Sequence, residues 1–576
     1  MQALTFERNR QVASFLYEIA ELLDLQGETF KPRAYRKAAK TIESLSEDIA
    51  NIAKRGELEE IPGVGSHIAP KIDEIVKTGG LTYLDRLKKD LPPGVRELSG
   101  IEGIGPKRAL LLSKELGVTS VAKLEEAARA GLVRDLPGFG EKSEQNILRI
   151  ISAQSTTAGR VLLGDILPVA EEIVQKLMQE PSAGRVSLAG SIRRMKETIG
   201  DVDILASSAQ SGKLMNAFVS LPGIERVVGK GPTKSTIVLK TGVQVDLRVV
   251  REDQFWTALQ YFTGSKDHNI ALRQRALDRG WTLNEYGITE VETGKNLPGK
   301  EERELYTLLD LQYIEPELRE NRGEVDAAEN GNLPSIVSYN ALRGDLHVHS
   351  SWSDGSDTIR EMADAARVAG YEYLAICDHT QSPETPQGIT EDRIAEQQKE
   401  IESINREIDN ITVLSGIECS IKSDGTLDIG KRFLKDFDLV VAGIHSGLQM
   451  REKELTNRIS SALHNDAVSI LAHPTGRILK EREPAALDYN ILFATAKDLG
   501  VLLEINGHPS RLDLPDTLCI QARETGVKFV VSSDAHARIK LRNVTFGIAT
   551  ARRGWLEAKD IANTLPKKEL LQLIQK

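Results

Sequence analysis

Cysteine, long apolar runs and an excess of positive charge are scarce or missing in this sequence of 576 residues. The three cysteines, which are too few and too widely spaced for a disulfide framework, are Cys377, Cys419 and Cys519. No apolar run approaches the ~20 residues that cross a membrane, and the first residues lack the apolar core of a signal peptide. We therefore expect a reduced, cytoplasmic protein without a membrane partner.

The net charge of −10 at first argues against a nucleic-acid partner, but the distribution of charge changes that conclusion. Residues 1–314 hold 43 basic and 43 acidic residues. Residues 341–576 hold 29 basic and 35 acidic residues, together with eight of the ten histidines. A chain of this length is expected to form about three to five domains. The two parts are expected to do different chemistry, and some acidic residues of the second part are candidate metal ligands.

A glycine-serine turn, paired arginines and two aspartates occur together in residues 188–205, Leu-Ala-Gly-Ser-Ile-Arg-Arg-Met-Lys-Glu-Thr-Ile-Gly-Asp-Val-Asp-Ile-Leu. Asp201 and Asp203 are two residues apart, so both point to one face of a strand. Gly190 allows the backbone to approach a phosphate. The side chains that can donate to phosphate oxygens are Ser191, Arg193 and Arg194. Two aspartates alone would also fit an exposed strand end, but the turn and the arginines favour a nucleotidyl-transfer site.

A third carboxylate is expected from the hairpin that follows. Residues 235–240 and 243–250 are two β-runs around Thr241-Gly242. Asp246 interrupts the second, otherwise apolar run, so we expect it on the sheet face beside Asp201 and Asp203. Three carboxylates can hold two hard cations about 3.5–4 Å apart for in-line phosphoryl transfer. Asp246 also fits a general base or an electrostatic partner for an attacking 3′-hydroxyl.

One short glycine-containing turn recurs three times in the first 145 residues, between stretches with helical spacing of apolar residues. The copies are Ile61-Pro-Gly-Val-Gly, Ile101-Glu-Gly-Ile-Gly and Leu136-Pro-Gly-Phe-Gly. Such a turn is the hairpin of a helix-hairpin-helix, in which backbone amides at a helix N-terminus face a DNA phosphate. The recurrence predicts sequence-independent DNA binding. The glycines concerned are Gly63, Gly65, Gly103, Gly105, Gly138 and Gly140.

Basic residues also gather in the first 80 residues: Lys31, Arg33, Arg36, Lys37, Lys40 and Lys71. A lysine with a lowered pKa can form a Schiff base with a sugar aldehyde. The alternative is that every member of the set contacts DNA phosphates. Composition does not choose between the two.

Beyond residue 340, apolar β-runs repeatedly end in a histidine or a carboxylate, and helical segments separate them. This is the rhythm of an α/β barrel with ligands at the C-terminal strand ends. Imidazole combined with carboxylate suits Zn²⁺, Mn²⁺ or Fe²⁺ better than Mg²⁺ alone. A single histidine at a strand end usually has a structural role. Here six of the ten histidines are placed at strand ends, which favours metal binding. The candidate ligands are His347, His349, Asp354, His379, Glu418, His445, His473, Asp534 and His536.

The motif Gly-Ser-x-Arg-Arg-x5-Gly-Asp-x-Asp, the later Asp246 and the run Tyr261-Phe-Thr-Gly-Ser resemble the family X DNA polymerases. The resemblance covers about residues 1–318. It implies a helical lyase-like domain with a helix-hairpin-helix (1–85), fingers with further repeats (86–155), a nucleotidyltransferase palm (156–260) and a thumb (261–318). Residues 319–340, acidic and rich in Asn, Gly and Pro, are predicted to be a linker.

The same resemblance implies roles for individual residues. Asp201, Asp203 and Asp246 would bind two Mg²⁺ in the palm. Residues implied to contact the nucleotide are Gly190, Ser191, Arg194, Gly200, Tyr261, Phe262, Gly264, Lys266 and Asn269, with Asn269 or Arg273 also reaching the template minor groove. Lys266 stands where eukaryotic repair members carry an acidic residue. The lyase nucleophile would be Lys71, with Lys31 and Tyr35 nearby, but His67 and Pro70 depart from the family pattern and leave that activity open.

Residues 341–576 resemble the PHP phosphoesterase domains, which are distorted barrels with three clustered metals. By this resemblance His347, His349, Glu418 and Asp534 would hold one metal. Glu418 would bridge to a second ion bound by His445 and His473, and Asp354, His379 and His536 would hold the third. The ions would be Mn²⁺ or Zn²⁺, and they would activate water to attack a phosphodiester.

Together these patterns predict a multidomain α/β protein with helical helix-hairpin-helix N-terminal domains, a mixed α+β palm and a C-terminal distorted α/β barrel. The expected function is a monomeric DNA-directed DNA polymerase that fills short gaps in DNA repair and carries a 3′→5′ exonuclease. Its partners would be gapped or primer-template DNA and dNTPs. Two alternatives are a template-independent nucleotidyltransferase and a non-catalytic DNA-binding scaffold. Because the predicted linker holds no motif, neither site is expected to use residues of the other half.

Overall fold

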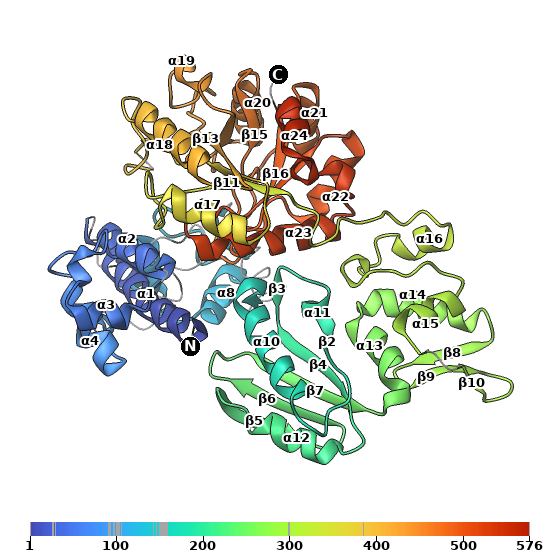
Figure 1. Cartoon of the computed structure of the whole chain (residues 1–576). Coiled ribbons are helices and arrows are strands. Elements are labelled where there is room, and N and C mark those ends of the chain that lie inside the picture. The colour runs from blue at the N-terminus through green and yellow to red at the C-terminus, as the bar shows by residue number, and fades with distance from the viewer. Residues whose placement is uncertain are drawn as a thin grey trace.

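The computed structural model describes residues 2–25, 28, 30–45, 47–89, 94–95, 98, 104, 106–141, 143–145, 147–148, 159–297, 300–383 and 385–574. Figure 1 shows four groups of elements: N-terminal helices, a mixed sheet, a smaller group of helices and short strands, and a C-terminal barrel. The predicted multidomain fold, with helix-hairpin-helix regions before a palm and a barrel, is confirmed. Among the described residues, no helix combines the length and apolarity needed to cross a membrane.

The N-terminal helices are amphipathic and pack around one apolar core. Along the first helix, Val12, Leu16, Ile19 and Leu23 recur at helical spacing and are all buried. The helices are α1 (Gln2–Leu25), α2 (Lys31–Ser44), α3 (Ile49–Arg55), α4 (Ala69–Thr78), α5 (Thr82–Lys89), α7 (Pro106–Leu116) and α8 (Val121–Arg129), with a 3₁₀ turn η1 (Leu58–Glu60). The first glycine turn precedes α4 and lies against α2, because a Cβ on Gly63 would come within 3.0 Å of Lys37 Cγ.

The palm is a five-stranded mixed sheet in the order β2-β4-β7-β6-β5, in which β4 runs parallel to β7. Alternate residues of β4 face opposite sides. Val202, Ile204 and Ala206 pack on the core under α10 and α12, whereas Leu205 packs beside Phe255 of α13. The elements are β1 (Val161–Leu162), α10 (Leu163–Met178), β2 (Val186–Leu188), α11 (Gly190–Arg193), β3 (Thr198–Ile199), β4 (Asp201–Ser207), α12 (Ser211–Val219), β5 (Ile224–Lys230), β6 (Lys234–Leu239) and β7 (Gln244–Val250).

The third group follows the palm and surrounds a buried ionic cluster. Its elements are η2 (Glu252–Gln254), α13 (Phe255–Thr263), α14 (Lys266–Leu277), β8 (Trp281–Asn284), β9 (Gly287–Glu290), β10 (Asn296–Leu297), α15 (Glu302–Leu308), η3 (Pro316–Leu318) and α16 (Glu324–Glu329). The guanidinium of Arg319 is fully buried and lies 2.6 Å from Glu302, which also pairs with Arg193 at 2.7 Å.

The acidic segment 319–340 is packed rather than free. It contains α16, and Glu324 is fully buried with its carboxylate 2.7 Å from His268 Nδ1. The composition of this segment predicted a solvated linker. Composition does not reveal that the acidic side chains have buried partners elsewhere in the chain.

The C-terminal part is a seven-stranded parallel sheet in sequential order that nearly closes into a barrel. Val348 forms a parallel bridge with Ala535, which brings the first strand to the end of the last. The strands are β11 (Gly344–Val348), β12 (Tyr373–Ile376), β13 (Thr412–Ser420), β14 (Leu439–Gly443), β15 (Val468–Leu471), β16 (Leu502–Asn506) and β17 (Phe529–Ser532). The α-helices are α17 (Ile359–Val368), α18 (Ile394–Glu407), α19 (Lys431–Leu434), α20 (Glu452–Leu463), α21 (Tyr489–Asp498), α22 (Asp516–Thr525), α23 (Val544–Arg553) and α24 (Lys567–Ile574). The 3₁₀ turns are η4 (Arg538–Asn543), η5 (Ala558–Asp560) and η6 (Ala562–Thr564).

The palm and the barrel share a core. Leu512 and Phe546 of the barrel belong to the apolar cluster under the palm sheet. Arg477 of the barrel pairs with Glu197 of the palm, and Lys480 donates to the carbonyl of Arg160 at 2.6 Å. The two halves therefore form a continuous packed unit.

The cluster around Glu302 generates a prediction about stability. Burial raises the pKa of Glu302, but the charges of Arg319 and Arg193 outweigh burial and lower it to about 2. The ionised carboxylate therefore stabilises the fold above pH ~4.5, and this contribution is lost as the pH falls towards 2. Glu302→Gln leaves Arg319 buried without its counter-charge, so the local free energy of unfolding of α15 should fall by about 3–5 kcal/mol at pH 7.

Hydrogen exchange of α15 amides measures this change, with the exposed neighbour Glu301→Gln as the matched control. The difference between wild type and Glu302→Gln should shrink as the pH is lowered from ~4.5 to ~2. Equal protection of α15 in both variants at pH 7 would contradict the assigned role of the cluster.

Candidate active sites

The three palm aspartates lie together, as the strand pattern predicted. Parallel pairing of β4 and β7 sets Asp203 beside Asp246. Asp201, Asp203 and Asp246 each place a carboxylate oxygen within 4.8 Å of the others. Burial, followed by the charges of Asp201 and Asp246, raises the pKa of Asp203 to about 6. Three crowded carboxylates with few buried counter-charges are a donor set that fits hard divalent cations.

Two residues that the sequence analysis did not single out hold Asp246. Lys234 Nζ lies 2.7 Å from Asp246 Oδ2, and Thr236 donates to Oδ1 at 2.7 Å. The hairpin register places Thr236 directly opposite Asp246. The contact between Thr236 and Asp246 could therefore have been predicted from the sequence, because a turn at Thr241-Gly242 fixes the pairing of the two strands.

Gly190 has a more local reason to be glycine than contact with a phosphate. Its φ is +61°, and a Cβ at this position would lie 2.2 Å from Asp203 Oδ2. Any side chain here would displace the carboxylate. The turn thus places the start of α11 against Asp203, with Ser191 as the next residue of the helix.

Arg194 is already engaged by other parts of the chain. Its Nε donates to Glu320 at 3.0 Å, and its Nη1 donates to the carbonyl of Thr263 at 2.5 Å. The predicted contact with an incoming triphosphate would therefore use the remaining N–H groups of Arg194 or exchange Glu320 for phosphate oxygens.

Side-chain contacts hold Tyr261 and Phe262, the aromatic residues of the segment that follows the palm. Asn269 donates to the carbonyl of Tyr261 at 2.7 Å. The guanidinium of Arg273 lies 5.5 Å from the Tyr261 ring, and that of Arg248 lies 4.5 Å from the Phe262 ring. The remaining implied contacts are backbone or surface positions: Gly200 directly before β4, Gly264 with φ +66°, and exposed Lys266 as the first residue of α14.

Lys71 is the candidate nucleophile of the N-terminal region, and the structure gives it aromatic neighbours. Its Nζ lies 5.9 Å from the Tyr35 ring and 4.9 Å from the ring of Tyr83, a residue that the sequence analysis missed. Burial lowers the pKa of Lys71, which favours the neutral amine. Lys31 instead pairs with Glu28 at the surface at 2.7 Å.

Of the predicted DNA-binding glycines, Gly63, Gly65, Gly138 and Gly140 are in described turns, and Gly63 and Gly138 have positive φ angles of +88° and +81°. Gly103 and Gly105 lie outside the described residues. Arg108 of α7 donates to the carbonyl of Gly138 at 2.5 Å, which joins the second repeat to the third.

Glu418, at the end of β13, is the centre of the barrel site. Its Oε1 lies 3.2 Å from His445 and 3.1 Å from His473, and its Oε2 lies 3.2 Å from His347 and 3.0 Å from His379. Burial raises the pKa of Glu418, but the imidazoles outweigh burial and hold it well below its usual range. Each oxygen of Glu418 thus faces a different pair of imidazoles. This is the arrangement expected of a carboxylate that bridges two metal ions.

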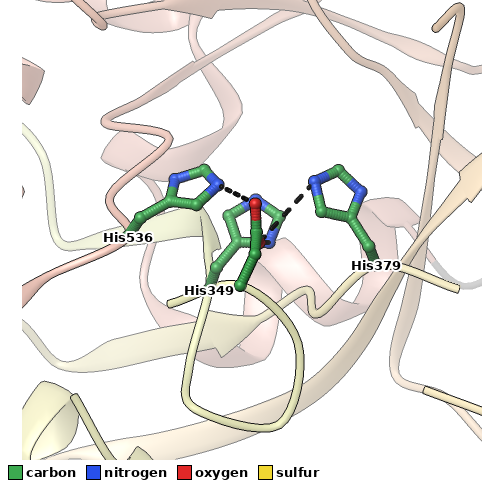
Figure 2. A group of neighbouring side chains, drawn as sticks. His349, His379 and His536 are labelled. Atoms are coloured by element: carbon green, nitrogen blue, oxygen red, sulfur yellow. Dashed lines mark ion pairs between the residues drawn. The ribbon is translucent and has the colours of Figure 1, made fainter. Parts of the chain in front are cut away.

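A second carboxylate, Asp354, joins the rings of His349, His379 and His536, which converge in Figure 2. His536 Nε2 lies 3.2 Å from Asp354, and the nearest nitrogens of the other two rings lie 3.9 Å away. Asp534 completes the cluster, with Oδ1 3.3 Å from His349 Nε2. All nine predicted barrel ligands therefore gather at the C-terminal ends of the strands.

The donor set fits bound cations. His347 Nε2 and both ring nitrogens of His349 are buried and make no hydrogen bond. Burial lowers the pKa of His349 to about 3, which keeps the imidazole in the neutral form that binds metals. A Cβ on Gly443 would lie 2.9 Å from Glu418 Oε1, so no larger residue fits against the cluster.

Two residues near the cluster were missed by the sequence analysis. Glu504, a charged residue in the apolar strand β16, lies 2.7 Å from His347 Nδ1 and fixes the ring orientation. Glu504 could have been predicted in the same way as Asp246, because each is a carboxylate in an otherwise apolar run. Lys40 of the N-terminal helix α2 lies 2.6 Å from Asp354. Nothing in the local sequence indicates that contact.

Comparisons with known proteins agree with the fold. Four family models match: a helix-hairpin-helix domain at residues 7–81, a SAM-like helix-hairpin-helix tandem at 95–152, the DNA polymerase beta thumb at 258–320 and the PHP domain at 345–508. The chain is 37% identical over 564 residues to the DNA polymerase/3′-5′ exonuclease PolX of Bacillus subtilis (strain 168), covering 97% of this chain and 98% of that protein.

Two further relatives each match part of the chain. DNA polymerase lambda of Rattus norvegicus is 27% identical over 350 residues, covering 54% of this chain and 56% of the relative. A probable phosphatase of Caldanaerobacter subterraneus subsp. tengcongensis is 29% identical over 203 residues, covering 33% of this chain and 75% of the phosphatase. The fold and the two sites define a family X polymerase joined to a PHP phosphoesterase. The chain belongs to the family of the bacterial polymerase/3′-5′ exonuclease PolX.

The close fit at Gly443 generates a prediction. Gly443→Ala forces a Cβ against Glu418, so the affinity of the barrel for Mn²⁺ or Zn²⁺ should fall at least about 10-fold. Metal content after dialysis against limiting cation, measured by mass spectrometry, tests this. Gly430→Ala is the control in the same domain, because its Cβ would meet no atom closer than 3.3 Å. Unchanged metal content in Gly443→Ala would contradict the proposed ligand cluster.

Proposed function

We propose that this protein is a DNA-directed DNA polymerase that fills short gaps during DNA repair and removes 3′-terminal nucleotides with its barrel. The observation that supports this best is the presence of two separate ligand sets on one chain. One set is three carboxylates beside a glycine-serine turn, and the other is a carboxylate-centred group of imidazoles. The substrates would be gapped or primer-template DNA and dNTPs, and the protein would act as a cytoplasmic monomer.

In the palm, Asp201, Asp203 and Asp246 would hold two Mg²⁺, which supply charge that stabilises in-line phosphoryl transfer when bound. The chain contributes positioning. Lys234 and Thr236 fix the carboxylate of Asp246. The Gly190 turn would present Ser191 and Arg194 to the triphosphate. Tyr261, Phe262, Gly264, Lys266 and Asn269 would surround the nucleotide, and Arg273 would reach the template strand.

In the barrel, the nine clustered ligands would hold up to three Mn²⁺ or Zn²⁺, which activate water for attack on a phosphodiester when bound. Glu418 would serve two of these positions, because its two oxygens face different imidazoles. Glu504 holds His347 in one orientation. The barrel would take a flexible 3′ end, whereas the helix-hairpin-helix repeats would hold paired DNA through its phosphates.

Two further assignments belong to this proposal. Residues 1–85, 86–155, 156–260, 261–318 and 341–576 would be the lyase-like, fingers, palm, thumb and PHP domains, with 319–340 between the last two. Lys71 is a candidate Schiff-base nucleophile near Tyr35, supported by the lowered pKa of its amine. Trapping of a borohydride-reduced adduct with abasic-site DNA in wild type, and its loss in Lys71→Ala, would test that role.

A template-independent nucleotidyltransferase with an attached phosphoesterase is the alternative function. The helix-hairpin-helix repeats favour templated synthesis, because they bind duplex backbones on either side of a gap. Primer extension with and without a template strand separates the two functions. Extension that is independent of the template would replace our proposal with the alternative.

The two ligand sets generate a paired prediction. Asp203→Ala removes one carboxylate from a site that works by positioning and electrostatics, so gap filling should fall about 10³-fold, equivalent to roughly 4 kcal/mol. Glu418→Ala should abolish 3′→5′ digestion, because a shared ligand is lost, and leave gap filling nearly intact. Gapped and single-stranded oligonucleotides assayed in Mg²⁺ and Mn²⁺ measure both activities. Loss of digestion in folded, DNA-bound Asp203→Ala would assign the exonuclease to the palm instead.

A further inference from the structure

Helix α2 of the N-terminal region reaches the rim of the barrel site. Lys40 places its ammonium 2.6 Å from Asp354 Oδ2, although the two residues are 314 positions apart in the sequence. Glu43, one turn further along α2, lines the same cavity. Tyr17 of α1 donates to Glu43 at 3.4 Å. Helix α2 therefore lies against the barrel mouth.

The cavity beneath this contact is the ligand site itself. It has a volume of about 440 Å³, and its walls include Glu418, Asp534 and four of the clustered histidines. Its rim carries cationic side chains from two different regions: Lys40 from α2, and Arg482, Arg511 and Lys540 from the barrel. A cavity with metal ligands at its floor and cations around its rim suits a phosphodiester, whose oxygens carry negative charge.

We propose that Lys40 is a substrate-contacting residue of the exonuclease, supplied by the N-terminal region, and that it binds a non-bridging oxygen of the phosphate to be cleaved. The inference rests on the proposed exonuclease function of the barrel. It extends that function because the active site then spans two parts of the chain. It also corrects the expectation that neither site uses residues of the other half.

The geometry favours a role in substrate contact. Asp354 is 7% exposed, and its Oδ1 faces His349 and His379. Its Oδ2 is shared by Lys40 at 2.6 Å and His536 Nε2 at 3.2 Å, so Lys40 lies directly beside the ligand cluster. Lys40 itself is 54% exposed, so its ammonium can swing from Asp354 towards a phosphate in the cavity. A lysine on a flexible stem suits this exchange, because it binds phosphate as a compact point charge.

The experiment compares 3′→5′ digestion of a single-stranded oligonucleotide by the full chain and its variants in Mn²⁺. Lys40→Ala should raise KM about 10-fold and change kcat less than about 2-fold, because the phosphate charge is present in both substrate and transition state. Lys40→Glu should raise KM about 100-fold, since it adds repulsion. Lys40→Arg should restore KM to within about 3-fold of wild type. The control Lys54→Ala removes an exposed positive charge from the last turn of α3 in the same region and should leave KM unchanged.

A second measurement does not depend on turnover. A phosphorothioate-ended oligonucleotide should protect Lys40 from acetylation, as measured by mass spectrometry, and leave Lys77, a 70% exposed lysine of α4, reactive. Digestion by wild type with an unchanged KM in Lys40→Ala would overturn the inference and keep the exonuclease function. Faster digestion or higher metal content in Lys40→Ala would also overturn it, because Lys40 would then be an obstruction. Absence of digestion by metal-loaded wild type would overturn both.

Discussion

The buried arginine Arg553, in the barrel helix α23, contacts three parts of the chain at once. It is 2% exposed, and it donates to the carbonyl of Arg194 at 2.7 Å, to Glu320 at 3.0 Å and to Asp516 at 2.7 Å. A guanidinium in the interior is tolerated only where acceptors offset the loss of water. These acceptors come from the palm, the segment after the thumb and the barrel, so the contact can form only when all three are in place.

The contacts of Arg553 extend to the candidate polymerase site. Glu320 accepts from Arg553 and from Arg194, the residue next to the glycine-serine turn. The barrel therefore supports the same loop that is expected to bind the triphosphate. If Arg194 moved from Glu320, the carboxylate would remain paired with Arg553. One carboxylate thus contacts both the arginine beside the glycine-serine turn and the barrel helix α23.

The palm aspartates and the barrel ligands were predictable because each, apart from Asp354, lies on or shortly after an apolar strand. Asp246 and Glu418 stand out as charged residues in runs that are otherwise buried, and strand periodicity fixes the face they occupy. The role of Gly190 was only partly predictable. The sequence indicated a close approach of the backbone, but the partner is Asp203, which becomes a neighbour only after β4 has paired within the sheet.

Contacts between segments that are distant in the sequence could not be predicted from local sequence patterns. Lys40 has the same helical context as Lys37, and only the docking of α2 against the barrel distinguishes it. The acidic residues of 319–340 have the composition of a linker, yet Glu320 and Glu324 are held by arginine and histidine partners that precede or follow them by many residues. Periodicity reports which face of an element is buried, but it does not report what covers that face.

Helix α2 is the element in which these separate contacts meet. Tyr35 and Lys40 are five residues apart, so they point about 140° away from each other around the helix axis. Tyr35 is buried beside the candidate nucleophile Lys71, whereas Lys40 reaches the barrel site. Lys71 itself belongs to α4, so α2 lies between the candidate nucleophile and the barrel and contacts both.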